Sequence, residues 1–155
     1  MARFNVGKGL DAYIRKLEKA SNKSQEILGQ CVYEGAKIVA DQMRAQIQGI
    51  PVSEEYVPNG KKRSGASKDE KDGLLAGFGI AKMSNDNGFL NVKPGFSGKN
   101  ADGTANATVA RAINSGTSFR QAYPFVSRAV SASRGPAEKA IEKKLTDELQ
   151  KIFGS

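Results

Sequence analysis

Few side chains in this sequence could carry out acid–base, nucleophilic or metal chemistry. There is no His, and Cys31 is the single Cys. Without His there is no Ser-His-Asp or Cys-His catalytic arrangement and no imidazole ligand for a metal. One Cys excludes an internal disulfide and any zinc site built from several thiolates. We therefore expect no enzymatic activity, no metal site and no cofactor.

Two further patterns have the composition of a ligand site without its spacing. The glycines around Phe78 do not lead into the Lys-Ser/Thr of a phosphate-binding loop, which argues against a nucleotide site. The acidic residues of the run 69–72 alternate with lysines and lack the ligand positions of a calcium loop, so we predict a solvated charge run. Cys31 lies on an apolar helical stripe, where a buried and inert thiol is expected.

Positive charge is concentrated in one part of the chain. The 24 Lys and Arg against 16 Asp and Glu give a formal net charge of +8. Residues 89–136 hold six basic residues and only Asp102 as an acid; the six are Lys93, Lys99, Arg111, Arg120, Arg128 and Arg134. Such a surplus attracts a polyanion or an acidic protein surface without specifying which, and it also fits a solvated basic face.

The length of 155 residues favours one domain over residues 1–155. The first ten residues lack the apolar stretch of a signal peptide, and residues 74–81 are too short an apolar run to span a bilayer. We therefore expect a soluble protein that is made in a cytosol.

Apolar spacing predicts helices in both halves of the chain. A short helix is expected over Gly9–Ala20, and a second one of about 25 residues from a cap at Asn22 to near Gly49. Gly35 lies on the apolar stripe of the second helix, where its lack of a side chain favours the close approach of another element.

The C-terminal half predicts three more helices. Asn106 is expected to cap a short helix closed by Gly116, and Pro124 to open another. Gly135-Pro136 should break or sharply kink that helix, and a final amphipathic helix is expected from Ala137.

The central part of the chain predicts a hairpin between two loops. Residues 77–83 and 89–96 read as strands around the turn-forming run 84–88. The polar segments 51–73 and 97–105 read as long mobile loops. The sequence therefore predicts an α+β fold, with a small mainly antiparallel sheet over about 77–96 packed against several helices.

One set of short motifs occurs in a recognisable order. Residues 112–117 read Ala-Ile-Asn-Ser-Gly-Thr, followed by Tyr123-Pro124-Phe125-Val126 and then Arg128-Ala129. Phe4-Asn5-Val6, residues 33–36 (Tyr-Glu-Gly-Ala) and residues 85–89 (Asn-Asp-Asn-Gly-Phe) agree with the same order. The chain in this respect resembles the tail-completion proteins of long-tailed bacteriophages and prophages, over nearly its whole length.

The resemblance implies a structural role in the virion. Proteins of this family assemble, typically as a sixfold ring, at the head-proximal end of the tail and form part of the neck that joins the tail to the capsid. Their helices pack on one side of a small antiparallel sheet, and long loops project away. The interruption at Gly135-Pro136 departs from the unbroken terminal helix that is common in the family.

The implied partners are copies of the same chain, the tail-tube protein and a head-completion or neck protein. The basic surplus would face either the DNA of the channel or an acidic neck partner; neither a membrane nor a small-molecule substrate is implied. In the resemblance, Gly116, Thr117, Pro124 and Phe125 are structural motif residues. Our candidate contacts with a subunit or partner are Tyr56, Val57, Lys61, Lys62, Arg63, Phe96, Lys99 and Arg120.

Two other function classes stay open at this point. Arg residues with Tyr123 and Phe119 nearby suggest a small basic nucleic-acid-binding protein, although no recognised nucleic-acid-binding motif accompanies them. A toxin or hydrolase that uses Asp and Lys would need a paired-carboxylate arrangement, and the sequence offers none that we can point to.

Overall fold

The computed structural model describes residues 24–55, 57–58 and 60–153. The predicted helix over 9–20 and the cap at Asn22 lie outside the described residues. The elements in chain order are α2 (Ser24–Gln48), α3 (Lys68–Gly77), β1 (Phe78–Ile80), β2 (Ser84–Asp86), β3 (Phe89–Asn91), β4 (Pro94–Phe96), α4 (Asn106–Ser115) and α5 (Phe125–Phe153). The fold is α+β, as the sequence predicts.

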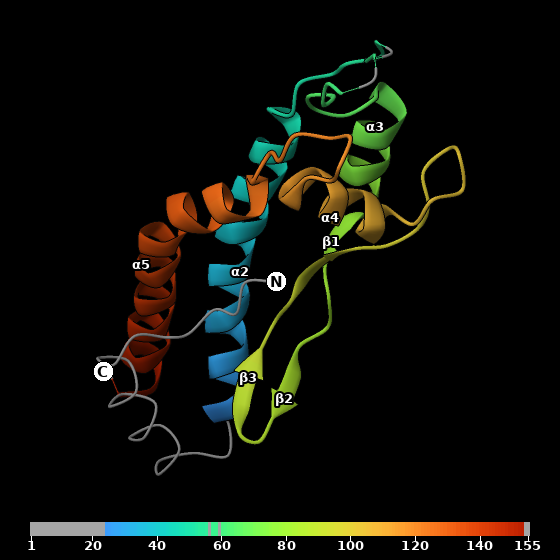
Figure 1. Ribbon diagram of the computed structural model, residues 1–155. Helices are drawn as coiled ribbons and strands as arrows, with labels where there is room; N and C mark the ends of the chain where they lie inside the picture. The colour runs from blue at the N-terminus through green and yellow to red at the C-terminus, as the bar shows by residue number, and fades with distance from the viewer. Residues whose placement is uncertain (1–23, 56, 59, 154–155) are drawn as a thin grey trace.

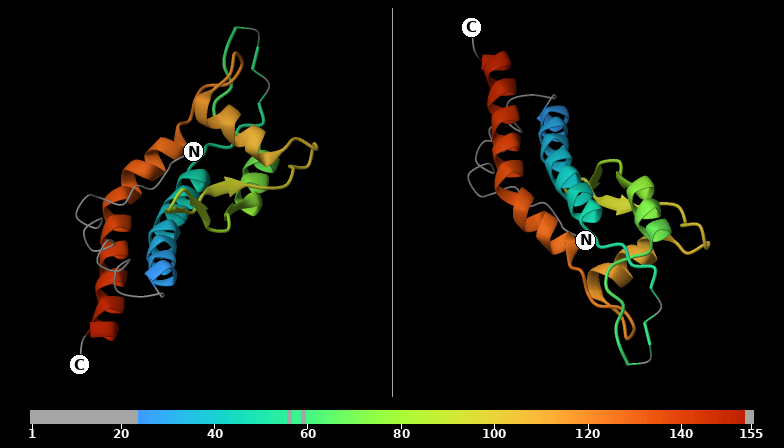
Figure 2. Two further views of the ribbon diagram at one scale, coloured as in Figure 1. Left: turned by 90° about the horizontal axis from the view of Figure 1, so that it is seen from below. Right: turned by 90° about the horizontal axis from the view of Figure 1, so that it is seen from above.

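Two long helices, α2 and α5, lie side by side and form the length of the molecule (Figure 1). The smaller elements α3, α4, β1 and β4 gather around the C-terminal end of α2, as both views of Figure 2 also show. The predicted close approach at Gly35 is confirmed. A Cβ at this position would lie 2.6 Å from Cδ1 and 2.8 Å from Cγ1 of Ile141 on α5.

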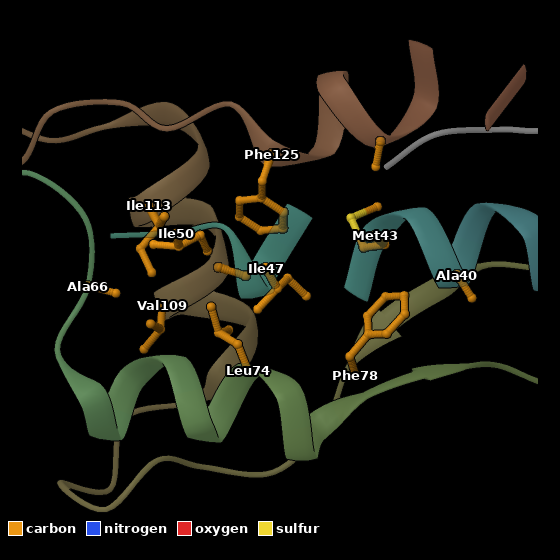
Figure 3. Packing of buried hydrophobic residues seen from close by; sticks show 12 residues of the cluster. Ala40, Met43, Ile47, Ile50, Ala66, Leu74, Phe78, Val109, Ile113 and Phe125 are labelled. Carbon is orange, nitrogen blue, oxygen red and sulfur yellow. The ribbon is translucent and has the colours of Figure 1, made fainter. Parts of the chain in front are cut away.

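The described hydrophobic core has two parts. The larger part surrounds Phe125, whose side chain is fully buried among residues from α2, α3, β1 and α4 (Figure 3). The smaller part lies between α2 and the C-terminal half of α5 and contains Ile27, Cys31, Ile141 and Leu145. Cys31 is 2% exposed, and its burial raises the pKa of its thiol to about 11. The thiol therefore stays protonated at neutral pH, as expected for an inert Cys.

Helix α5 is continuous through the predicted break. Pro136 lies inside it, and the helix changes direction along its length between the orange and red parts in Figure 1. Proline removes one helical N–H and its ring crowds the preceding turn, so a kink is the expected result. The prediction of a kink is confirmed, whereas a separate final helix beginning at Ala137 is wrong.

The predicted antiparallel hairpin is confirmed, with an interruption in the middle. Its bounds need correction, because residues 84–86, expected in the turn, form β2 and Gly77, expected in the first strand, ends α3. Strands β1 and β4 pair antiparallel from Phe78↔Phe96 to Ile80↔Pro94, and β2 and β3 pair from Ser84↔Asn91 to Asp86↔Phe89. Between the two ladders, residues 81–83 lie opposite residues 92–93, so one strand holds an extra residue. An extra residue of this kind defines a β-bulge, which bends the two-stranded ribbon and changes the direction of its far end.

Two local predictions need correction. Residues 68–73, expected in a loop, belong to α3, which begins with a capping box in which Ser67 and Glu70 bond each other's backbone N–H. The predicted cap Asn106 is instead the first residue of α4, and Ala105 is the capping residue. The buried Asn106 side chain donates a 2.8 Å hydrogen bond to the Ser97 carbonyl. It therefore helps to hold the segment 97–105 in place.

Candidate interface

The region that we call the loop end consists of residues 51–66 and 116–124, of which 56 and 59 are not described. It lies at one end of the molecule, beyond the C-terminus of α2 (Figure 1). Residues 63–66 pair on one side with Val52, through Val52↔Ala66, and on the other with the second segment, through Arg63↔Arg120. Two parallel bridges thus place residues 63–66 between the chain around Val52 and the chain around Arg120.

A group of three charged residues, here the arginine–glutamate cluster, ties these stretches to α3. Glu70 accepts hydrogen bonds from Arg120, with Nη2 to Oε1 at 2.7 Å and Nη1 to Oε2 at 3.1 Å. Arg63 Nη2 lies 3.7 Å from Glu70 Oε2 and donates to the Ser53 carbonyl at 2.6 Å. Arg120 also donates to the Gly65 carbonyl at 2.9 Å. The cluster therefore fixes residues 53, 63–65 and 120 against one carboxylate.

The arginine–glutamate cluster is largely buried and holds two positive charges against one negative charge. The side chains of Arg120 and Glu70 are 7% and 16% exposed. Burial acts to raise the pKa of Glu70, but hydrogen bonds from Arg120 and the Ser67 backbone, with the charges of Arg120 and Arg63, outweigh it and hold the pKa below its ordinary value. Two guanidinium groups share this one carboxylate, and within the described residues the buried Nε atoms of both have no hydrogen-bond partner. The geometry of the loop end thus depends on keeping Glu70 ionised.

The outer side of the loop end carries apolar and basic side chains. Val52 is 50% exposed and Phe119 is 66% exposed, on the two segments that flank residues 63–66. Lys61 and Lys62 are exposed and form no ion pair with any described residue. Aromatic side chains are enriched among the residues that dominate protein–protein contacts, so Phe119 is a candidate anchor.

A second projection, here the hairpin tip, is formed by residues 84–91. Its turn has positive φ at both central residues, 54° at Asn87 and 86° at Gly88, as expected for the Asn-Gly turn of a tight hairpin. Asn91 receives a hydrogen bond from Ser84 at 2.7 Å and donates one to Asp86 at 2.8 Å. Phe89, directly after the turn, is 75% exposed.

The motif residues of the family resemblance form the base of the loop end. Gly116 has a φ of 76°, and a Cβ there would lie 2.9 Å from the Ala122 nitrogen. Thr117 donates its backbone N–H to the Arg120 carbonyl at 3.0 Å. Pro124 immediately precedes α5, whose first residue is the fully buried Phe125. These four residues therefore shape the turn between α4 and α5.

Asn114, in the same motif, caps the N-terminal end of α5, although it lies 12 residues earlier in the sequence than its partner Val126. The Asn114 side chain accepts the backbone N–H of Val126 at 3.1 Å, and the Tyr123 N–H bonds the Ile113 carbonyl at 2.7 Å. Residues 113–126 thus leave α4, turn and enter α5 as one hydrogen-bonded unit.

The structure sorts the predicted contact residues into three groups. Lys61, Lys62 and Lys99 are exposed, and Val57 is half-buried. Tyr56 lies outside the described residues. Arg63 and Arg120 belong to the arginine–glutamate cluster, and Arg120 is only 6% exposed, so it is wrong as a direct contact.

Phe96 is half-buried. Its ring lies 5.3 Å from that of Phe78 and 6.2 Å from that of Phe125, measured between centroids, and it packs against the larger core. Much of its ring therefore contacts the chain's own core.

Val52, Phe89 and Glu70 were missed by sequence reasoning, and Phe119 was considered only for nucleic-acid binding. Val52, Phe89 and Phe119 are single apolar residues in polar surroundings, and such residues give no periodic signal. Glu70 was assigned to a solvated charge run, but Ser67 three residues before it is the signature of a capping box and could have placed it at a helix start.

The basic surplus of residues 89–136 is divided among different contacts. Arg120 is buried in the cluster, and the Arg128 guanidinium lies 4.5 Å above the centroid of the Tyr123 ring. Arg134 lies 3.7 Å from Glu138, and Lys93 lies 3.9 Å from Asp86. Clustering of these charges in the sequence therefore does not correspond to a group of equally free cations.

No family model, curated protein or solved structure matches this chain. Across residues 24–153, as far as they are described, no helix is long and apolar enough to cross a membrane. The same residues contain no group of three or more Cys, Asp or Glu side chains placed to hold a metal ion.

Proposed function

We propose that this protein is a structural virion component that completes the tail of a long-tailed phage and helps to join it to the head. In this role it assembles as a ring at the head-proximal end of the tail. Its partners are copies of itself, the tail-tube protein and a head-completion or neck protein. Its location is the virion, after synthesis in the cytoplasm of the bacterial host.

One observation carries the proposal: the scaffold presents two different projections, each with a highly exposed aromatic residue. The loop end carries Phe119 and the hairpin tip carries Phe89, and they lie toward opposite ends of the molecule (Figure 1). A ring is built from head-to-tail contacts, which need two different surfaces on each subunit. A two-fold dimer would need only one self-complementary surface.

The construction of the motif 113–126 supports the same proposal. Its hydrogen bonds join α4, the loop end and α5, so the motif positions the loop end on the helical scaffold. The order of the motifs over residues 113–126 is therefore consistent with a need to present the loop end.

Deletion of the gene from the phage or prophage that carries it tests the role. We expect filled heads and separate tails by electron microscopy, and a loss of infectious particles that the gene restores when supplied in trans. Joined, infectious virions in the absence of the protein would refute the proposal.

Surface substitutions test whether the two exposed aromatic residues are needed for joining. Phe119→Ser and Phe89→Ser should leave the melting temperature nearly unchanged, because both side chains are mostly exposed, and each should prevent joining. Lys139→Ser, at an exposed position of α5, is the matched control and should support normal joining. Deletion of residues 54–71 is unsuitable, since it would remove Glu70 and the first turn of α3.

Direct nucleic-acid binding is the competing function. It predicts micromolar affinity for random duplex DNA and, for six or more neutralised phosphates, a loss of about three decades of affinity between 50 and 200 mM salt. The burial of Arg120 and the stacking of Arg128 on Tyr123 argue against all six basic residues of 89–136 being free to bind phosphates. Steeply salt-dependent binding would favour this competitor.

A further inference from the structure

The hairpin tip is a rigid carrier for Phe89. Besides the bonds around Asn91, the Asn85 side chain accepts the Gly88 N–H at 2.8 Å, which closes the turn. At its base, the Met83 N–H donates to the Tyr33 hydroxyl on α2 at 3.2 Å. A binding element that is already in its final conformation loses little conformational entropy on docking. The exposed Phe89 is therefore suited to act as an anchor.

The loop end offers a surface of matching character. Val52 and Phe119 supply apolar area, and the ion-paired arginine–glutamate cluster holds the segments that carry them. Nearby, Lys61 and Lys62 are exposed, while Glu54 is turned toward α3 and accepts the Lys68 N–H at 2.8 Å. The surface therefore favours an apolar group accompanied by a carboxylate.

The hairpin tip supplies both groups. Next to the turn, Asp86 has a side chain that is 58% exposed, with Lys93 as a distant partner at 3.9 Å. Asp86 and Phe89 are opposite one another in the β2–β3 ladder, so a carboxylate and an aromatic ring are presented together. Complementary charge beside an apolar contact fixes the orientation of two partners.

Within one chain the two surfaces cannot meet, because they lie toward opposite ends of the scaffold (Figure 1). We propose that the hairpin tip of one copy docks on the loop end of the next, with Phe89 against Val52 and Phe119 and with Asp86 facing Lys61 and Lys62. This inference rests on the proposed function and specifies the contact by which the ring is formed. The contact joins unlike surfaces, so it can repeat from copy to copy, as the contacts of a ring do.

Disulfide trapping between two variants tests this contact in the purified full chain. Asn87→Cys and Ser118→Cys, at exposed positions that leave Phe89 and Phe119 in place, are mixed in equal amounts at about 1 mM and oxidised gently. At this concentration even an interface with a millimolar Kd is substantially occupied. The native Cys31 is retained, since it is 2% exposed and its pKa is raised to about 11. We expect the mixed disulfide to exceed each homodimer at least tenfold. A mixture of Asn87→Cys with Ser131→Cys, an exposed position on α5, measures random collisions.

Charge reversal tests the orientation of the contact. Asp86→Lys in the Asn87→Cys chain should reduce the mixed disulfide about tenfold, and Lys61→Glu with Lys62→Glu in the partner chain should restore it. Mixed disulfide no more abundant than with the Ser131→Cys control, or a dominant Asn87→Cys homodimer, would overturn the inference. The gene-deletion experiment tests tail joining with the native protein and does not depend on this contact. Failure of the contact can therefore be distinguished from failure of the proposed function.

Discussion

The helix pair and the loop end are held together by different kinds of contact. In the helix pair, formed by α2 and residues 137–153 of α5, apolar side chains at helical spacing meet along two continuous helices. In the loop end, Arg120 reaches Glu70 across 50 residues of sequence, and Arg63 joins them through a longer contact. The first region depends on a regular pattern of side chains, and the second depends on three individual residues.

The difference teaches where the molecule tolerates change. Apolar contacts are non-directional, and the stability of the helix pair is the sum of many small contributions. One substitution there therefore removes only one of several contributions. Removing one member of a buried ion pair leaves the other charge without compensation. The loop end should therefore be the more sensitive region to a single polar substitution.

The largest effect is expected for Arg120→Ala. It removes both hydrogen bonds to Glu70 and the bond to the Gly65 carbonyl, and it leaves a carboxylate that is 16% exposed. We expect the free energy of unfolding to fall by about 3–5 kcal/mol, measured by urea denaturation at pH 7.

A matched arginine provides the control for this prediction. Arg128 is exposed and stacks on Tyr123, so Arg128→Ala should cost only about 0.5–1 kcal/mol. Equal losses for the two variants would mean that the cluster contributes no more than a surface contact, and the contrast between the two regions would disappear.

Acid should act on the loop end through Glu70. The folded pKa of Glu70 is lowered, so ionisation of this group stabilises the fold above its unfolded pKa, and that stability is lost as the pH falls through the folded value. At pH 7, Glu70→Gln should be less stable than the native chain by about 1.5–3 kcal/mol, the range for hydrogen bonds to charged groups.

The measurement is the difference between the two unfolding free energies as a function of pH. It should be constant near neutrality and shrink in the acid range below about pH 4.5, where Glu70 becomes protonated. A difference that begins to shrink near pH 6 would contradict a lowered pKa. The carboxylates of the helix pair whose pKa is also lowered, Glu34 and Glu148, are present in both chains and therefore cancel in this difference.

The same contrast explains what the sequence could and could not predict. Helix α2, the close approach at Gly35, the kink near Pro136 and the Asn-Gly turn each depend on residues that are neighbours in the sequence or share a helical face. Local rules of periodicity and turn chemistry therefore suffice for them.

The loop end could not be predicted in this way. Helix α3 buries only Leu74, so it has almost no apolar periodicity, and its start depends on the Ser67–Glu70 capping box. Nothing in the sequence joins Arg120 to Glu70, since their pairing requires α3 and the segment 116–124 to be in place first. For the same reason Arg120 was assigned to an exposed basic surface when it is buried.

Packing in the helix pair gives the next prediction. Gly35→Ala would improve helix propensity by about 1 kcal/mol but would place a Cβ 2.6 Å from Ile141 Cδ1. Overpacking of this kind costs about 1–3 kcal/mol, so a net loss of up to about 2 kcal/mol is expected. Ile141→Val removes that Cδ1 atom but keeps Cγ1, which would lie 2.8 Å from the added Cβ, so in this background Gly35→Ala should cost less without becoming fully neutral.

A double-mutant cycle measures this coupling from four urea denaturation curves. We expect an interaction energy of about 1–2 kcal/mol between positions 35 and 141. Exposed Lys37 on the same helix is the control, and Lys37→Ala should show no coupling to Ile141→Val. Additive effects at 35 and 141 would mean that the two helices move apart at little cost, and then the helix pair would be less closely packed than the structure indicates.

The smallest effect concerns the junction between the two regions, where Asn114 accepts the Val126 N–H at 3.1 Å. Asn114→Ala removes an acceptor from the start of α5 and should cost about 1 kcal/mol, as for the loss of a helix cap. Asn114→Asp keeps the acceptor and adds negative charge at a helix N-terminus, so it should be at least as stable as the native chain. The neighbouring exposed Ser115→Ala should change stability little. If Asn114→Ala and Ser115→Ala proved equal, the bond to Val126 would not hold α5 to the loop end, and the two regions would be coupled through the core around Phe125 alone.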